Sequence, residues 1–260
     1  MVKVWTHPCA KGKNFGDVLT PILLEHHGLK VEKVNKSQNS TLIGIGSILE
    51  CVSGANKLIW TTGSMFGRPK VINKESKIIA VRGKLTLNTL KGSVDKESIK
   101  LGDGGLLVRD LCDDMCPDKK YKLGVIPHYI DVGYAKTNLD VLLSAEDVLF
   151  IDILADPMVV LQNIMSCEKI VSSSLHGLVA ADSLSIPNRH VTFNGSKKIA
   201  GGGFKYRDYY SVFDVGGSDI SPMDITAKTS LETIIGWTKD YHRGNIDQII
   251  DEIRSTINAL

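Results

Sequence analysis

The sequence predicts an α/β protein in which two halves each contain a parallel β-sheet covered by helices. Apolar runs of strand length alternate regularly with segments of helical spacing along the 260 residues. Several of these runs end in a glycine-bearing turn, such as Gly46-Ser47 or Gly63-Ser64. The polar segment 112–120 separates one β-then-α series from a second series, so we expect a domain linker there.

The first half begins with a β-branched run at residues 2–6, which predicts a strand. A turn at residues 14–17 follows, and apolar residues then recur at helical spacing up to Gly28, a typical residue after a helix end. Because proline is tolerated in a first helical turn, Pro21 predicts that this helix begins between Asp17 and Thr20. Further strands are expected at 41–45, 57–61, 77–81 and 98–101, with a helix at 85–90.

The second half repeats this order. Strands are expected at 121–126, 148–153, 169–172 and 190–193, with helices at 157–165 and 175–184. Pro157 suits the start of a helix. The clearest helix is the segment 245–257, with Asn245 as its cap and one stripe of isoleucines that we expect to pack on the body of the protein.

Composition excludes several classes of protein. Hydrophobic residues make up 43% and charged residues 23%, which is typical of a folded globular chain. The 31 Lys and Arg nearly balance the 29 Asp and Glu, and there is no basic stripe, so we expect no nucleic-acid partner. No apolar run approaches the ~18–20 residues of a membrane span and no signal peptide is evident, so we expect a cytoplasmic protein.

The five cysteines are odd in number and scattered, which favours a reducing compartment over a disulfide scaffold. Cys112 and Cys116 share a short segment, but a second pair of ligands at metal-binding spacing is missing from the sequence. We therefore predict two free thiols there and no metal site.

Polar or small residues follow nearly every predicted strand at its carboxyl end. In open α/β sheets ligands bind beyond that edge, so these residues form one candidate rim. In the first half they are Asn14, Gly16, Asp17, Ser47, Ser64, Arg82 and Asp103, and in the second half His128, Asp152, the serines at 172–174 and His176.

The segment 170–177 is the most informative part of this rim. A strand ends, three serines follow and a helix begins. The first turn of a helix has unpaired N–H groups and a positive dipole end, which suit a phosphate or a carboxylate. The dipole disfavours a protonated His176, so a neutral ring that relays a proton fits the site. Alternatively, the serines only cap the helix and His176 is a packing residue.

Three other positions have two interpretations each. His128 follows a strand and a proline, and it is either a partner of His176 on the rim or a hydrogen-bonded corner. Arg82, at a strand end, either binds a carboxylate or phosphate or forms a surface salt bridge. The segment 201–210, with Lys205 and Arg207 among tyrosines, is either a mobile lid over the ligand or an exposed loop.

An ordered set of motifs between about Asn14 and Tyr210 resembles the polysaccharide pyruvyl transferase family, especially its branch that forms pyruvate ketals in exopolysaccharides. The motifs are Asn14-Phe15-Gly16-Asp17 with Pro21, Gly44-Ile45-Gly46-Ser47-Ile48-Leu49, Gly63-Ser64, Val81-Arg82-Gly83-Lys84-Leu85-Thr86, Leu101-Gly102-Asp103-Gly104-Gly105-Leu106-Leu107, Ile126-Pro127-His128-Tyr129, Ser173-Ser174-Leu175-His176-Gly177, Ala181-Asp182-Ser183-Leu184-Ser185-Ile186-Pro187 and Arg207-Asp208-Tyr209-Tyr210.

The resemblance implies a GT-B-like fold, meaning two Rossmann-like halves that face a cleft. Residues 1–118 would form the acceptor-side domain, residues 119–225 the donor-side domain, and residues 226–260 a helical segment that packs back on the body. The implied activity moves the pyruvyl group of phosphoenolpyruvate onto a hexose of a polysaccharide repeat unit as a ketal, in exopolysaccharide, capsule or cell-wall polymer biosynthesis. Phosphoenolpyruvate is then a co-substrate, and no cofactor is implied.

Some family members carry an arginine directly before the Leu-His pair, where this chain has Ser174. The donor would therefore be bound by other residues, and we expect these to be Ser173, Ser174, Leu175, Arg82, Lys205 and Arg207. The catalytic residues we expect are His176, His128 and Asp17, and the acceptor-binding residues are Asn14, Gly16, Ser47, Ser64 and Asp103.

Two other function classes stay open. A nucleotide-sugar-dependent glycosyltransferase of the same fold would need a pocket for a base and a ribose. A non-catalytic sugar-binding protein would keep its ligand after His128→Ala and His176→Ala. A polyprenyl-linked acceptor would bring the enzyme to the inner membrane face, although no basic amphipathic helix indicates membrane binding.

Overall fold

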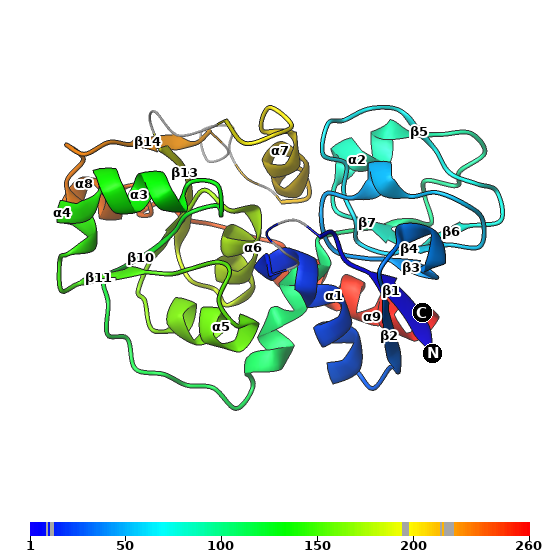
Figure 1. Ribbon diagram of the computed structural model, residues 1–260, viewed down its shortest axis with the longest axis horizontal. Coiled ribbons are helices and arrows are strands. Elements are labelled where there is room, and N and C mark those ends of the chain that lie inside the picture. Colours follow the sequence, from blue (N-terminus) through cyan, green and yellow to red (C-terminus); the bar gives the residue numbers. More distant parts are fainter. Residues whose placement is uncertain (9, 11–12, 194–197, 214, 216–220) are drawn as a thin grey trace. The chain divides into compact units, whose positions relative to one another are not determined.

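The computed structural model describes residues 1–8, 10, 13–193, 198–213, 215 and 221–260 (Figure 1). It divides into two compact units. Unit 1 comprises Met1–Leu107, Ala200–Asp214 and Asn245–Leu260, and unit 2 comprises Val108–Ile199 and Val215–Gly244. The chain therefore returns twice to unit 1 after it has entered unit 2.

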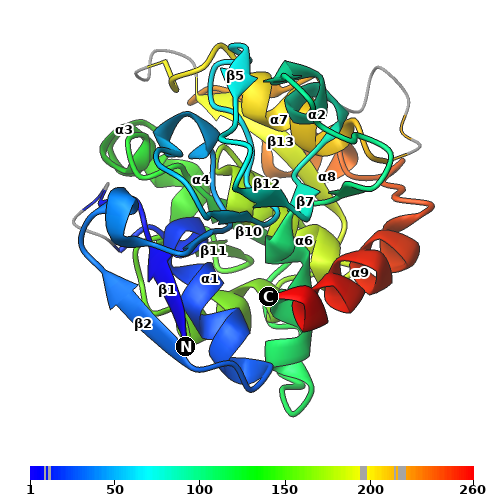
Figure 2. The same ribbon diagram turned by 90° about the vertical axis from the view of Figure 1, so that its right-hand side faces the viewer.

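Unit 1 is built on a five-stranded parallel sheet with the strand order β2-β1-β3-β4-β6, and Figure 2 shows its edge strand β2 beside β1. The strands are β1 (Val2–Trp5), β2 (Val31–Val34), β3 (Leu42–Ile43), β4 (Leu58–Ile59) and β6 (Lys77–Ile78). Two further parallel pairs are β5 (Lys70–Val71) with β8 (Leu90–Lys91), and β7 (Ala80–Val81) with β9 (Lys100–Leu101). Buried aliphatic residues from these strands and the loops between them form the core of the unit.

The helices of unit 1 come from both ends of the chain. They are α1 (Phe15–His26), α2 (Lys84–Thr89), α7 (Phe204–Tyr210) and α9 (Ile246–Ser255), with 3₁₀ segments at Ser37–Asn39, Leu49–Cys51 and Thr256–Ala259, and a fourth, Gly104–Cys112, that runs on into unit 2. The predicted isoleucine stripe of α9 is buried, and Ile249 and Ile253 pack against the backbone of Gly102. Asn245 is the N-cap residue of α9, as predicted, but its side-chain amide donates to the Val212 carbonyl (2.9 Å) and does not cap the helix.

Helix α1 begins earlier than Pro21 predicts. It starts at Phe15, so the proline lies inside the helix rather than in its first turn. The backbone N–H groups of Asp17 and Val18 donate to the Asn14 carbonyl, which sets the start at residue 15. The early start matters for the site, because it places Asp17 in the first helical turn.

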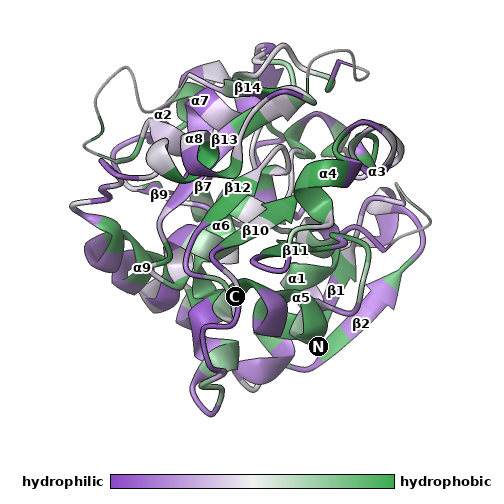
Figure 3. Ribbon diagram, turned by 90° about the vertical axis from the view of Figure 1, so that its left-hand side faces the viewer, coloured by the Kyte–Doolittle hydropathy of each residue, from purple (hydrophilic) through white to green (hydrophobic). Residues whose placement is uncertain are grey.

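Unit 2 is built on a second five-stranded parallel sheet with the order β11-β10-β12-β13-β14. The strands are β10 (Leu123–Ile126), β11 (Val148–Phe150), β12 (Ile170–Ser172), β13 (Asn188–Phe193) and β14 (Met223–Ile225). The helices are α3 (Val132–Asn138), α4 (Asp140–Leu143), α5 (Pro157–Met165), α6 (Leu175–Ser183) and α8 (Leu231–Gly236). Strands β10 and β12 are fully buried and, apart from Ser172, carry no polar side chain (Figure 3), as is typical of parallel strands covered on both faces.

The α/β class with parallel sheets is confirmed, and two such sheets match the GT-B-like arrangement that the resemblance implies. In each sheet the first strand lies between the second and the third. Ligands of open α/β sheets bind beyond the carboxyl ends of the strands at this switch point. The switch points lie between β1 and β3 in unit 1 and between β10 and β12 in unit 2.

The two units differ in extent from the predicted division at 1–118, 119–225 and 226–260. The segment 200–214 belongs to unit 1, and residues 226–244 belong to unit 2 while only 245–260 return to unit 1. Contacts between residues far apart in the sequence cause this. One is the ion pair between Arg82 and Asp208, and another is the hydrogen bond from the Trp60 indole to the Thr256 hydroxyl (2.8 Å).

Gly133 offers a stabilising substitution. It is an exposed residue inside α3, and a Cβ placed there would meet no atom within 4 Å. Because alanine loses less backbone entropy than glycine on folding, Gly133→Ala is expected to stabilise unit 2 by about 0.5–1 kcal/mol. The matched control is Gly177→Ala in α6, where a Cβ would lie 2.5 Å from the Ser172 hydroxyl. Urea denaturation should shift to higher concentration for the first variant and to lower concentration for the second.

Candidate active site

The switch point of unit 2 brings together the loops after β10 and β12. Ile126 and Ser172, the last residues of these strands, are paired in the sheet. The backbone N–H of His128 donates to the Ser173 hydroxyl (2.8 Å), which donates in turn to the Asp131 carboxylate (2.6 Å). These bonds fix the His128 loop against the segment that leads into His176. The structure therefore brings the two predicted histidines to one edge of one sheet.

Two of the three serines, Ser172 and Ser173, use their hydroxyls in hydrogen bonds within the loops of the site. The Ser172 hydroxyl contacts the Ile126 carbonyl (2.9 Å) and accepts from the Ser174 N–H (2.9 Å). The Ser173 hydroxyl joins His128 to Asp131, as described above. Ser174 differs from both, because it is the N-cap residue of α6 and its side chain does not cap the helix. Of the three hydroxyls, that of Ser174 is the best placed to meet a ligand.

The first turn of α6 has the properties of an anion site. The first intrahelical donor is the N–H of Leu178, which binds the Ser174 carbonyl (3.3 Å), so the N–H groups of the preceding turn point out of the helix start. Ser174 and His176 are 4% and 7% exposed. Gly177 lets the helix approach the strand, since a Cβ there would lie 3.0 Å from the Ile126 side chain. The dipole and amides of this turn favour a negatively charged group.

His128 is half-buried, and its ring is held by neighbouring residues. The ring lies 4.4 Å from that of Tyr129, and its Nδ1 accepts from the Ile130 N–H (3.4 Å). Because Nδ1 accepts, the proton of the neutral ring is assigned to Nε2. Asp131, which the sequence reasoning missed, is 1% exposed and holds Ser173. Its position three residues after His128, at the start of a helix, is the signal that could have found it.

The switch point of unit 1 holds Asn14, Gly16 and Asp17. The Asn14 amide donates to the Asp17 carboxylate (2.8 Å), which faces the backbone of Gly46 in the loop after β3. Thr61, in the loop after β4, has a φ of +59°, a strained conformation for a β-branched residue and one found at functional sites. Asp103, after β9, is fully buried and accepts from the Gly105 N–H (2.8 Å).

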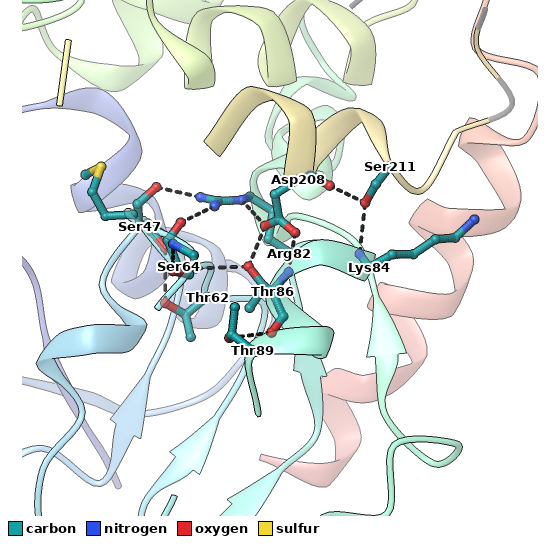
Figure 4. Close-up of polar contacts among 12 residues, drawn as sticks. Ser47, Thr62, Ser64, Arg82, Lys84, Thr86, Thr89, Asp208 and Ser211 are labelled. Carbon is teal, nitrogen blue, oxygen red and sulfur yellow. Dashed lines mark hydrogen bonds and ion pairs between the residues drawn. The ribbon is translucent and has the colours of Figure 1, made fainter. Parts of the chain in front are cut away.

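Arg82 is neither exposed nor part of a surface salt bridge (Figure 4). Its Nε donates to the Asp208 carboxylate (2.8 Å), and its other two nitrogens donate to the Ser47 hydroxyl (2.5 Å) and the Ser64 carbonyl (2.7 Å). The guanidinium and carboxylate are both fully buried. Arg82 is expected from the sequence to bind the donor, and Ser47 and Ser64 are expected to bind the acceptor. Arg82 is instead hydrogen-bonded to both serines inside unit 1.

The exposed loop predicted as one alternative for the segment 201–210 is wrong. Residues Phe204–Tyr210 form helix α7, whose tyrosines are buried. Lys205 is 7% exposed and lies over the Tyr206 ring (5.1 Å). Arg207 is exposed, and one of its nitrogens donates to the Gly202 carbonyl (2.9 Å). Asp208 anchors this helix to Arg82, a contact between residues far apart in the sequence that local patterns do not reveal.

The loop after β4 is held by Glu50. The Ser64 hydroxyl and the backbone N–H groups of Met65 and Phe66 donate to this carboxylate. Burial alone would raise the pKa of Glu50, but these hydrogen bonds outweigh it and hold the pKa below its usual 4.5.

The lowered pKa of Glu50 predicts a pH-dependent contribution to stability. This contribution is present above pH 4.5 and is lost as the pH falls through the lower pKa of the folded state. Glu50→Gln should therefore lower the urea midpoint at pH 7. Below pH 4 the urea midpoints of the variant and of the unchanged protein should lie closer together. Glu97→Gln, an exposed control, should leave the midpoint unchanged at both pH values.

The described cysteines at 51, 112, 116 and 167 are free thiols, whereas Cys9 lies outside the described residues. Burial raises the pKa of Cys112 and that of Cys167 to about 11, so both thiols are protonated at neutral pH. Among the described residues, no group of three or more His, Cys, Asp or Glu is arranged to hold a metal ion. In the same part of the chain, no helix combines the length and the apolar character that crossing a bilayer requires.

Comparison with known proteins supports the resemblance. Residues 69–194 match the family model described as Polysaccharide pyruvyl transferase, which covers Arg82, Asp103, His128 and the segment 172–176. Over 176 residues the chain is 40% identical to an uncharacterized protein of Acanthamoeba polyphaga mimivirus, an alignment that covers 66% of this chain and 59% of that protein. No solved structure matches the chain. The family match supports a transferase.

Proposed function

We propose that this chain, in which residues 69–194 match the polysaccharide pyruvyl transferase family, moves the pyruvyl group of phosphoenolpyruvate onto a hexose of a polysaccharide as a ketal. The observation that carries the proposal is the switch point of unit 2. There His128, Ser174 and His176 lie at the carboxyl ends of neighbouring strands, within the part of the chain that matches the family. The product would enter an exopolysaccharide, capsule or cell-wall polymer.

The donor carries a phosphate and a carboxylate, and both need cationic or N–H partners. The amides of the first turn of α6 and the Ser174 hydroxyl supply such partners. Arg82 is a weaker candidate than the sequence suggests, because its charge is already compensated by Asp208. We therefore propose that the phosphate or carboxylate of the donor is bound chiefly by Ser174, Leu175 and the helix dipole.

The two imidazoles supply proton transfer. One protonates the methylene carbon of the donor, which makes the neighbouring carbon electrophilic, and the other accepts the proton of the attacking sugar hydroxyl. The new C–O bond to the sugar forms, the bond between this carbon and the phosphate oxygen breaks and phosphate leaves. A second hydroxyl of the same hexose then attacks the same carbon and closes the ketal, and its proton passes to the departing phosphate, which is released as hydrogen phosphate. His128 and His176 share these roles, and their positions at one sheet edge support this assignment.

The acceptor hydroxyls would be bound by the switch point of unit 1. Asp17 is 8% exposed and is held in place by Asn14, so its carboxylate can accept a bond from a sugar hydroxyl or act as a base. Ser47 and Ser64 are less suited to this role than the sequence suggests, since both are engaged with Arg82, and Ser64 also contacts Glu50.

Phosphate release from phosphoenolpyruvate tests the proposal. The protein is incubated with this donor and a panel of galactosides, glucosides and N-acetylmannosaminides, both free and polyprenyl-linked. We expect phosphate release that depends on one acceptor, together with a product that has gained one pyruvyl ketal. No turnover of phosphoenolpyruvate with any acceptor, together with turnover of a nucleotide sugar, would instead establish the glycosyltransferase alternative. A preference for the polyprenyl-linked form would place the reaction at a membrane face.

A further inference from the structure

Unit 2 contains a pocket at the sheet edge opposite the candidate active site. Its volume is about 290 Å³, and its walls include Asn188 and Met223, the first residues of β13 and β14. His128 and His176 instead follow the last residues of β10 and β12. All strands of this sheet are parallel, so the pocket lies at the amino ends of the strands and the histidines lie at the carboxyl ends.

The walls of the pocket are held by one buried carboxylate, that of Asp182 at the end of α6. This residue is fully buried and accepts from the Asn188 amide (2.6 Å) and the Tyr241 hydroxyl (2.9 Å). It also forms an ion pair with Arg243 (3.3 Å). Three lining side chains thus share one fixed partner, which is the arrangement of a preformed binding site.

The remaining wall groups combine flat apolar faces with hydrogen-bonding atoms. Trp237 and Tyr241 are half-buried, and the Arg243 guanidinium lies over the Tyr241 ring (4.9 Å). The Oδ1 atom of Asn188 is buried and has no hydrogen-bond partner among the described residues. A buried carbonyl oxygen of this kind favours a ligand that can donate to it. Asp240 is exposed at the same pocket and adds a second acceptor.

The charges of the pocket favour a neutral ligand. Arg243 is balanced by Asp182, and the half-buried Arg189 shares the pocket with Asp240, so the four groups sum to zero. The volume lies just below the ~300–1,000 Å³ typical of small-molecule sites, and a single sugar ring fits it better than a nucleotide. Aromatic faces beside amide, carboxylate and guanidinium groups match the apolar faces and hydroxyls of a hexopyranose.

We propose that this pocket is a second saccharide site that binds one neutral hexopyranose residue, separate from the proposed transfer site. The sugar lies on the faces of Trp237 and Tyr241 and donates to Asn188 and Asp240. This proposal rests only on contacts within the pocket, so it does not depend on the proposed pyruvyl transfer. In a protein that acts on polysaccharide, it would bind a residue of the polymer outside the reacting one.

NMR titration tests the proposal with the full chain. The chain has three tryptophans, and Trp237→Phe assigns the indole N–H signal of the pocket. Methyl glycosides of galactose, glucose and mannose are added in turn, with inorganic phosphate as a separate anion probe. We expect saturable shifts of the Trp237 signal with at least one glycoside and none with phosphate. Asp240→Ala should weaken that binding at least 10-fold, whereas Asp114→Ala, an exposed control in unit 2, should leave it unchanged.

His176→Gln separates this proposal from the proposed function. It should abolish phosphate release from phosphoenolpyruvate and leave the glycoside shift of Trp237 intact. The second saccharide site is overturned if no glycoside shifts Trp237, if phosphate alone shifts it, or if Asp240→Ala binds as tightly as Asp114→Ala. Failure of phosphate release in the unchanged protein overturns the proposed transfer and leaves the saccharide site standing.

Discussion

His176→Gln is expected to lower the rate of pyruvyl transfer by about 10²–10⁴-fold, the usual contribution of a positioned general acid or base. Glutamine keeps much of the volume and the hydrogen bonding of histidine but cannot relay a proton at neutral pH. The measurement is single-turnover phosphate release from phosphoenolpyruvate with the acceptor found by the panel. One limb of the pH–rate profile should also disappear, which a purely structural role would not cause.

His242→Gln is the matched control for this prediction, because His242 is an exposed histidine of the same unit. Its rate should equal that of the unchanged protein. A thermal melt of His176→Gln that matches the unchanged protein shows that the loss is chemical. Retained activity with an unaltered pH profile would remove His176 from the mechanism and leave it as a packing residue of α6.

Asp208→Ala is expected to lower the free energy of unfolding of unit 1 by about 3–5 kcal/mol, since it leaves a buried charge without its partner. The Arg82 guanidinium is fully buried, and Asp208 is its only carboxylate contact among the described hydrogen bonds. The same substitution removes the acceptor of the Thr86 N–H and hydroxyl, both at 2.6 Å (Figure 4). The loss of unfolding free energy can be measured as faster hydrogen exchange of the backbone amides in β4 and β7.

The control is Asp251→Ala, which breaks the exposed ion pair with Arg254 (2.6 Å) on α9. Exposed pairs contribute about 0–1 kcal/mol, so exchange in β4 and β7 should barely change. Replacing Asp208 and Arg82 together with Leu and Met should recover part of the loss, because no unpaired charge then remains. Equal effects of Asp208→Ala and Asp251→Ala would show that the buried pair does not anchor α7.

Much of the fold could be predicted because its strands carry strong local patterns. The buried strand β10 is a continuous apolar run, β12 is apolar up to Ser172, and α5 begins at the proline that predicts it. Strand β2 was missed because its Val-Glu-Lys-Val sequence is partly exposed at the sheet edge and resembles a loop. Helix α7 was missed for a different reason, because its main anchor lies 126 residues away in the sequence.

The site was predictable to the extent that topology determines it. The rule that ligands gather at carboxyl strand ends brought His128 and His176 together, and the strand order β11-β10-β12 places them at a switch point. Which serine meets a ligand was not predictable, because that depends on the partners of each hydroxyl. Ser172 and Ser173 are engaged within the loop, and only coordinates reveal this.

The two returns of the chain to unit 1 affect how this protein folds during synthesis. Asp208 and Thr256 are needed to pair with Arg82 and Trp60, and the ribosome makes both after unit 2 has begun to emerge. Unit 1 therefore stays incomplete until residues 245–260 have been made, whereas the sheet of unit 2 is complete at residue 225. A nascent chain released before residue 245 would expose the Trp60 region, making it a natural substrate for chaperones.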